Sequence, residues 1–235
     1  MKIRMIVLAG SAIALLALGA CGVIQDAGPQ TSQQRAVSGI RAVELQTSGD
    51  LTIMLGDIES LTVSAGAHVI DKLSSEVVAG TLVLGSEPLT GNGGSIQYTL
   101  TVRSLDGIAV QGSGNVTGAG VLTGEARLSI SGSGSATLSD LELSSLTADL
   151  SGSGGAVVGG SSPTSTVGVS GSGDYDGSGL STARTTVDCS GSGQARVNAS
   201  EFLSATVSGS GDVTYTGSPG QVDRDVSGSG DVSTG

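Results

Sequence analysis

A Ser-Gly-Ser-Gly segment, or a close copy of it, recurs seven times between Gly112 and Gly230, at intervals of 18 to 20 residues. A fixed period of this size is typical of a solenoid, in which each repeat buries its apolar face against the neighbouring repeats. The first glycines of the seven copies are Gly112, Gly132, Gly152, Gly171, Gly191, Gly209 and Gly228. This spacing constrains the fold more than any other feature of the sequence.

Apolar residues occupy alternate positions on both sides of each glycine pair, which is the period of a β-strand. Two residues before the first glycine stand Val110, Ile130, Leu150, Val169, Cys189, Val207 and Val226; four residues after it stand Val116, Ala136, Ala156, Tyr175, Ala195, Val213 and Val232. In a parallel sheet with rungs about 4.8 Å apart, equal positions stack into continuous apolar columns. The glycines then form a corner, where a positive φ or a close approach between coils leaves no room for a Cβ atom.

We therefore predict an all-β fold, a right-handed parallel β-helix with 18 to 20 residues per coil. An antiparallel meander is the alternative, but it needs two turns per 20 residues, whereas one Gly-Ser segment occurs per period. Disorder is a second alternative because glycine and serine are abundant, and the phased apolar columns argue against it. Aromatic residues make up only 2% of the chain, which fits a thin coil with room for small and branched side chains.

The N-terminus resembles a bacterial lipoprotein signal peptide. Lys2 and Arg4 precede an apolar run too short to span a membrane, and Leu18-Gly19-Ala20-Cys21 resembles the lipobox, whose cysteine is acylated. We expect residues 1–20 to be removed and Cys21 to carry the lipid that anchors the protein, facing the extracytoplasmic side of the membrane. A plain secretory signal with an incidental cysteine is the alternative.

Composition divides the remaining chain into three parts. Residues 21–37 lack an apolar period and are predicted to be a flexible tether; residues 38–104 are predicted to form the first coils and a cap, and residues 105–235 the regular repeat. Within the second part, we expect a helical turn or a bulge at residues 68–75 and a mobile loop at residues 86–95. At the other end, the charged residues 223–225 are expected to protect the edge of the last coil, and end-to-end pairing between molecules is left open.

The order of short strands in the first half resembles one bacterial family. The segments that carry the resemblance are Val-Glu-Leu (43–45), Ser-Gly-Asp-Leu-Thr-Ile (48–53), Leu-Thr-Val (61–63), Gly-Thr-Leu-Val-Leu (80–84), Tyr-Thr-Leu-Thr-Val (98–102) and Ile-Ala-Val-Gln-Gly-Ser-Gly (108–114). They are similar to the "putative auto-transporter adhesin, head GIN domain" family, from about Ser38 to the end of the chain. The resemblance implies an exported β-solenoid, often lipid-anchored, with no catalytic residues to carry over.

Few residues offer chemistry. The outward residues after the seven glycine pairs are Asn115, Ser135, Gly155, Asp174, Gln194, Asp212 and Asp231. Only three of them are carboxylates, so we expect neither catalysis nor a regular calcium ladder, and we attribute the acids to turns in which they bond their own backbone. An incidental calcium site between Asp212 and Asp231 is left open. His68 is the only histidine, which excludes sites with several histidines; we expect it to be solvated, and Cys189 to be a buried structural thiol.

The sequence thus predicts a non-catalytic structural or adhesive module without cofactor or metal. The net charge of −11 becomes −13 without Lys2 and Arg4, which makes nucleic acid a poor partner. A cell-wall or surface glycan, or another solenoid, suits the repetitive outer faces. A polysaccharide-acting envelope enzyme and a module that assembles through its open C-terminal coil are the alternatives.

Overall fold

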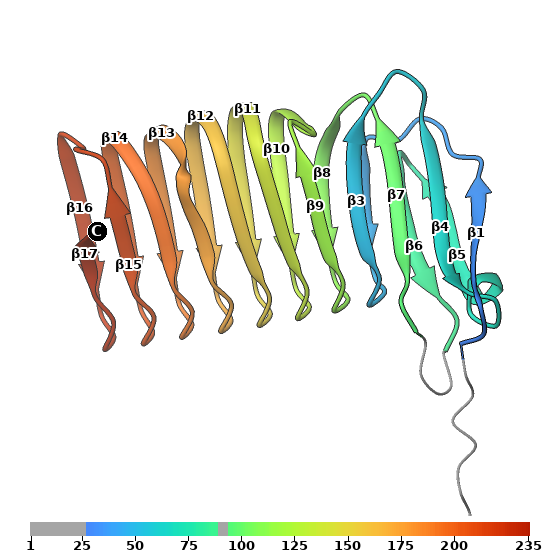
Figure 1. Cartoon of the computed structure of the whole chain (residues 1–235). Helices are drawn as coiled ribbons and strands as arrows, with labels where there is room; N and C mark the ends of the chain where they lie inside the picture. Colours follow the sequence, from blue (N-terminus) through green and yellow to red (C-terminus); the bar gives the residue numbers. More distant parts are fainter. Residues whose placement is uncertain (1–26, 89–93) are drawn as a thin grey trace, which may run out of the picture.

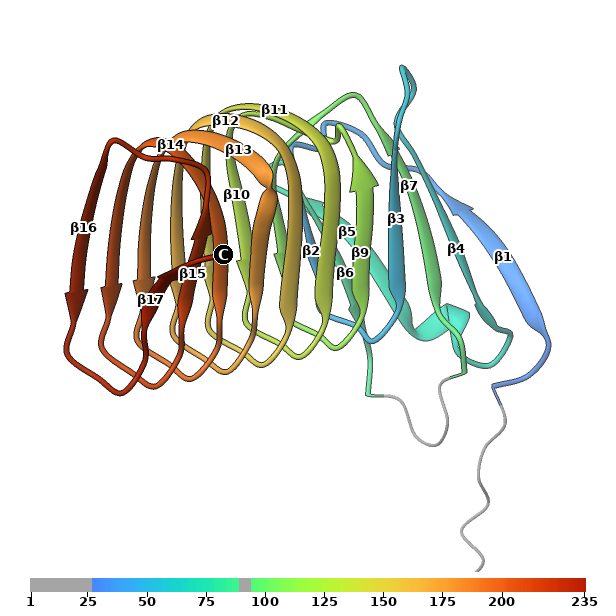
Figure 2. The same cartoon turned by 60° about the vertical axis from the view of Figure 1, so that its left-hand side comes forward.

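The chain winds into a parallel β-solenoid of about six turns (Figures 1 and 2). The computed structural model describes residues 27–88 and 94–235. Each regular coil contains one long strand that leaves a Gly-Ser corner, bends over the opposite side and returns to the next corner. These strands are β11 (Ser135–Leu150), β12 (Gly155–Val169), β13 (Tyr175–Cys189) and β14 (Ala195–Val207). The predicted parallel solenoid is confirmed.

Two sheet faces enclose the core. Face A, whose strands run into the Gly-Ser corners, contains β6 (Thr81–Ser86), β2 (Ala42–Leu45), β8 (Leu105–Val110), β10 (Leu122–Ile130), the second halves of β11 to β14, and β16 (Gln221–Val226). Face B, whose strands leave the corners, contains β4 (Ser60–Gly66), β7 (Gln97–Val102), β3 (Asp50–Leu55), β9 (Asn115–Ala119), the first halves of β11 to β14, β15 (Val213–Thr216) and β17 (Val232–Thr234).

The apolar columns predicted from the repeat are present in direct register. On face A, Leu150 pairs with Val169, Val169 with Cys189, and Cys189 with Val207. Each of these four side chains is at most 1% exposed. Burying each of the larger ones contributes about 1.5–3 kcal/mol, so the stacked columns are the main source of stability of the coil.

The corners are held by backbone hydrogen bonds between successive coils. The amides of Ser172 and Gly173 both donate to the carbonyl oxygen of Gly152 one coil earlier, at 3.1 and 3.2 Å. None of the paired corner glycines from Gly112 to Gly230 has a positive φ. Of the two reasons considered for glycine at the corner, close approach between coils is therefore the one that holds.

In the N-terminal cap, the strands do not lie side by side in the order in which they occur in the sequence. Strands β2 and β3 lie between the coil β8–β9 on one side and the later strands β6 and β7 on the other. Beyond these, β4 pairs antiparallel with β7, and β5 (Leu73–Val78) pairs antiparallel with β6. The cap thus combines a returning coil with antiparallel edge strands, which close the first rung.

Strand β1 (Gln30–Arg35) pairs antiparallel with β4. Residues 30–35 were expected to belong to the flexible tether, and this part of the expectation is wrong. Their polar side chains carry no apolar period because β1 is an outer edge strand, held by backbone hydrogen bonds to β4. The rest of the predicted tether, apart from residues 27–29, 36 and 37, lies outside the described residues, as does the predicted signal peptide.

The N-terminal end of the core is closed by Arg35. Its guanidinium group reaches from β1 on face B to the other side of the solenoid, donating to the carbonyl oxygens of Leu73 at 2.6 Å and Ile70 at 2.9 Å. Ile70 belongs to a short 3-10 helix, η1 (Ile70–Lys72), so the helical turn expected in residues 68–75 is confirmed. Of the loop expected at residues 86–95, positions 89–93 lie outside the described residues.

Candidate functional site

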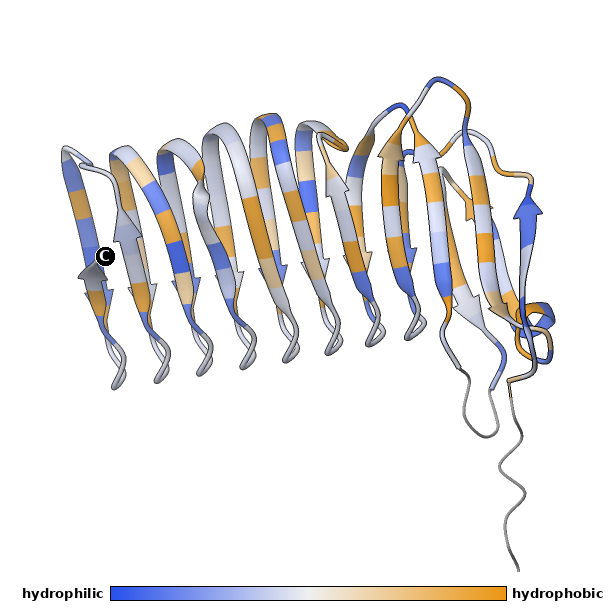
Figure 3. Cartoon of the chain, in the orientation of Figure 1, coloured by the Kyte–Doolittle hydropathy of each residue, from blue (hydrophilic) through white to orange (hydrophobic). Residues whose placement is uncertain are grey.

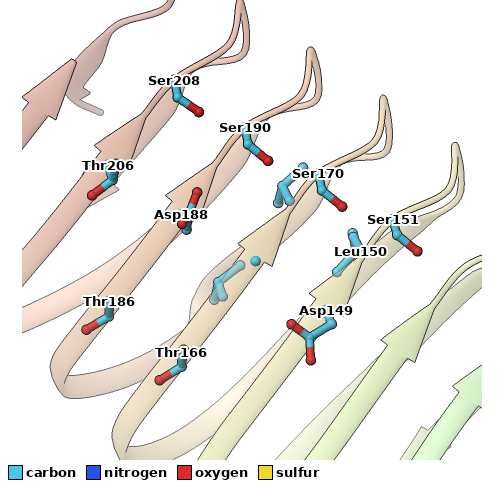
Figure 4. A pocket seen from close by; sticks show the side chains of 13 residues that line it. Asp149, Leu150, Ser151, Thr166, Ser170, Thr186, Asp188, Ser190, Thr206 and Ser208 are labelled. Atoms are coloured by element: carbon cyan, nitrogen blue, oxygen red, sulfur yellow. The ribbon is translucent and has the colours of Figure 1, made fainter. Parts of the chain in front are cut away.

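A shallow hollow of about 490 Å³ lies on the outer surface of face A, across β11 to β14 (Figure 4). Its walls are mostly hydroxyl side chains that repeat from one rung to the next. The serines that begin the corners are Ser151, Ser170, Ser190 and Ser208, and the threonines on the strands are Thr166, Thr186 and Thr206. The repeat period therefore produces a polar ladder on the outside for the same reason that it produces an apolar column inside.

Gly168 makes the hollow. It stands in an outward column between Asp149 and Asp188, in register with both, and it contributes no side chain. A Cβ atom at Gly168 would lie 3.1 Å from Oδ1 of Asp149, so this carboxylate leans over the glycine. The result is a depression with a carboxylate on either side and hydroxyl groups around it.

The chemistry of this surface is hydrogen bonding. The residues that line the hollow include no lysine, arginine, histidine or cysteine. Across the part of the chain that the structure describes, no group of three or more histidine, cysteine or acidic residues is placed to hold a metal ion. Serine and threonine hydroxyls both donate and accept, and the carboxylates accept, so the surface can bind a ligand rich in hydroxyl or amide groups.

The acids after the glycine pairs serve the corners in a way the sequence did not indicate. Oδ1 of Asp212 accepts a hydrogen bond from the amide of Asp231 at 3.0 Å, and Oδ1 of Asp174 accepts one from the amide of Gln194 at 2.9 Å. They were expected to bond their own backbone, and this is wrong, because stacking in register brings the amide of the next coil within reach. Asp212 and Asp231 have no third acidic neighbour among the described residues to complete a calcium site.

Two residues singled out in the sequence occupy structural positions. His68 is exposed in the turn between β4 and η1, as expected. Cys189 is fully buried, and its thiol donates to the carbonyl oxygen of Gly193 at 3.4 Å. Burial raises the pKa of this thiol, which keeps it in the unreactive protonated form. Cys21 lies outside the described residues.

A buried group of hydroxyls inside β12 and β13 was missed by the sequence analysis. In the column Leu146, Ser165, Thr185 and Leu203, two successive rungs carry hydroxyl groups where their neighbours carry leucine. Thr185 shares a 2.6 Å hydrogen bond with Thr182. In the sequence, this group is visible as Ser165 and Thr185 at positions where the neighbouring repeats carry Leu146 and Leu203.

The described residues contain no helix long and apolar enough to cross a membrane. This finding concerns residues 27–88 and 94–235 only.

Comparison with known proteins supports the fold. A family model described as "putative auto-transporter adhesin, head GIN domain" matches residues 40–219. A putative adhesin from Bacteroides fragilis superimposes with a TM-score of 0.83 at 21% identity, covering 88% of this chain and 97% of the other. A putative lipid binding protein from Parabacteroides distasonis has a TM-score of 0.70 at 21% identity, with the same coverages, and a putative adhesin from that species has 0.66 at 19%, covering 88% and 98%. No curated protein is significantly similar to the chain.

Proposed function

Because the chain belongs to the "putative auto-transporter adhesin, head GIN domain" family, we propose that it is an exported, lipid-anchored surface protein that binds partners through its solenoid without catalysing a reaction. The anchor is Cys21, and the solenoid faces the extracytoplasmic side. The family match and the similarity to putative adhesins support a binding role. The anchor rests on the lipobox-like sequence alone.

The contact surface is the hydroxyl-lined hollow of face A. The observation that carries this proposal is the gap at Gly168 in an otherwise continuous outward column, bordered by two carboxylates and a set of hydroxyl side chains. Such a surface fits a surface glycan, whose sugar units repeat as the rungs do. Each contact is weak, so affinity comes from engaging several rungs at once.

Aromatic stacking is not available to this surface. Tyr98 and Tyr175 are 1% exposed and Tyr215 is 5% exposed, and the ring of Phe202 lies under the guanidinium of Arg184 at 6.0 Å. The binding we propose therefore rests on hydrogen bonds and not on ring stacking. It should weaken when hydroxyl groups are removed, even if the shape of the face is kept.

A polysaccharide-cleaving enzyme is the second candidate, and the spacing of Asp149 and Asp188 bears on it. Two rungs place their Cα atoms about 9.6 Å apart, near the upper limit of about 9.5 Å between the carboxyl groups of inverting glycosidases. However, the general acid of such enzymes needs a pKa raised by burial, and both side chains are exposed. Binding is therefore favoured over cleavage.

The test of binding uses the full chain in detergent micelles and insoluble cell-wall glycan. Thr166→Val with Thr186→Val removes two hydroxyls from face A while keeping the side-chain shape, and Thr117→Val with Thr137→Val is the matched change on face B. We expect the face A variant to be retained less and the face B variant to be retained as the unmodified chain. Equal retention of both variants, or no retention of any protein, would overturn this proposal, and shortening of the glycan would identify an enzyme.

The test of the anchor is Cys21→Ser. We expect this variant to leave the membrane fraction, whereas Cys189→Ala should stay with it. A Cys21→Ser protein that still sediments with membranes would contradict lipid anchoring. Incorporation of labelled palmitate into the unmodified chain but not into the variant would support Cys21 as the lipidated residue.

A further inference from the structure

Strand β16 is the last strand of face A, and one of its edges has no partner among the described residues. It pairs in parallel with β14 over six residues, from Gln221 opposite Phe202 to Val226 opposite Val207. Figures 1 and 2 show β16 at the outer end of the solenoid. Its outer edge therefore presents free backbone amides and carbonyls at the spacing of a parallel ladder.

Figure 3 shows both hydrophobic and hydrophilic segments along β16, whose middle three residues, Asp223, Arg224 and Asp225, are all hydrophilic. Val222, Arg224 and Val226 continue the inward columns of Leu203, Ala205 and Val207. Val226 is 44% exposed, because no rung formed by the described residues covers it. Asp223 and Asp225 point outward and are exposed, and neither forms an ion pair with a described residue.

Arg224 closes the core without occupying the edge. Its guanidinium group lies 5.4 Å from the centre of the Tyr215 ring and donates to the Tyr215 hydroxyl and, at 3.2 Å, to the carbonyl oxygen of Val232. The long side chain thus folds back over the last rung, toward β15 and β17. The backbone edge of β16 stays accessible, with an apolar residue on either side of Arg224.

We propose that β16 accepts one further β-strand from a partner protein, an extended segment that alternates basic and apolar residues. Its apolar side chains would stack on Val222 and Val226, and its lysine or arginine side chains would lie beside Asp223 and Asp225. Main-chain hydrogen bonds provide affinity in this mode of recognition, and alternate side chains provide specificity. This site is separate from the hollow of face A and does not depend on the function proposed for it.

A second copy of the chain does not fit the edge. In the two longest antiparallel registers of two β16 strands that keep the inward and outward sides together, Asp223 of one copy faces Asp223 or Asp225 of the other. Strand β5 at the opposite end of the solenoid also carries an acidic residue, Glu76, on its outward side. Like charges placed opposite one another are destabilising, so the two aspartates disfavour these pairings with a second copy and favour a basic strand.

The test measures fluorescence anisotropy of a labelled octapeptide that alternates valine and lysine, titrated with the full chain in detergent micelles. We expect saturable binding of this peptide and none of a valine-glutamate analogue. In an extended peptide, the backbone amides of the valines point to one edge and those of the lysines to the other. N-methylation of all valines, or of all lysines, therefore blocks hydrogen bonding along one edge while keeping the charge. One of these two methylated peptides should not bind. Binding by both methylated peptides would show that charge alone is recognised and would overturn the proposal.

Charge reversal tests whether the peptide binds beside Asp223 and Asp225. Asp223→Lys with Asp225→Lys should weaken binding of the lysine peptide by about tenfold or more and allow the glutamate peptide to bind. Glu125→Lys with Glu142→Lys makes the same change in net charge on exposed residues of β10 and β11, and should leave the affinity within about twofold. Equal effects of the two variants, or dimerisation of the full chain that Asp223→Lys with Asp225→Lys abolishes, would overturn the assignment.

Discussion

A Cβ atom placed on Gly171 would lie 2.0 Å from the carbonyl oxygen of Gly152. The two glycines occupy the same corner position in successive coils, and the carbonyl of Gly152 accepts the amides of the two residues that follow Gly171. No backbone atom can retreat without breaking these bonds. The glycine of the repeat is thus required by the distance between coils.

The first prediction compares two glycines. Gly171→Ala should reduce the free energy of unfolding by about 4 kcal/mol or more, because the new Cβ overlaps backbone atoms held on both sides. Gly168→Ala should change it by no more than about 0.5 kcal/mol, because its nearest neighbour is the flexible carboxylate of Asp149 at 3.1 Å. Urea unfolding followed by circular dichroism measures both values. Similar losses in the two variants would contradict the close-approach explanation.

The second prediction concerns the C-terminal end of the core. Arg224→Ala removes the stacking on Tyr215 and two hydrogen bonds, and should lower the free energy of unfolding by about 1–2 kcal/mol. Arg184→Ala is the matched control, since Arg184 stacks on Phe202 at the longer distance of 6.0 Å and is 61% exposed. We expect this control to lose less than about 0.5 kcal/mol. If the control loses as much as Arg224→Ala, the end of the core does not depend on Arg224.

The third prediction concerns alkaline stability. Burial raises the pKa of the Tyr175 hydroxyl, and burial also raises that of Tyr98. As the pH rises, these tyrosine hydroxyls therefore ionise first in the unfolded chain, at their ordinary pKa of about 10. The contribution of each hydroxyl to the free energy of unfolding is constant below that pH and is lost above it. Tyr175→Phe should reduce the fall in the free energy of unfolding between pH 9 and 11, as measured by urea unfolding at each pH.

At neutral pH the same substitution should have little effect. The hydroxyls of Tyr175 and Ser165 are neighbours in the core, and neither makes a hydrogen bond of normal geometry with a described residue. Removing a buried hydroxyl without a partner costs no hydrogen bond, so Tyr175→Phe should keep the free energy of unfolding within about 1 kcal/mol. A large loss at pH 7, or an unchanged alkaline profile, would contradict this account of the site.

The regular half of the fold could be predicted because its contacts are periodic. Val169, Cys189 and Val207 stand 18 to 20 residues apart in the sequence and pair directly in the structure. The same period places Thr166 and Thr186 side by side on the outer surface. The hollow between these ladders follows from a single residue, Gly168, and a missing side chain in an outward column gives no signal until the register is known.

The cap could not be predicted in the same way, because its neighbours are not periodic. Leu45 contacts Leu84 on one side and Val110 on the other, and these separations share no common interval. The sequence of β1 predicts a tether, because an edge strand needs only backbone hydrogen bonds and leaves no apolar pattern. Local sequence thus identified most strands of the cap, while their order in space depends on long-range pairing.

The fourth prediction tests the buried thiol. In a Cys21→Ser background Cys189 is the only cysteine, so any reaction with a thiol reagent reports on this residue alone. Cys189 is 0% exposed, and burial raises the pKa of its thiol; both properties slow the reaction, because the reagent needs an accessible thiolate. We expect labelling in the native protein to be limited by global unfolding and to become rapid in urea. The rate should also rise in the Gly171→Ala variant, whose corner lies two residues beyond Val169 in the coil that packs on Cys189. Rapid labelling of the native protein would show that the column opens locally at this rung, and would contradict a core sealed by stacked coils.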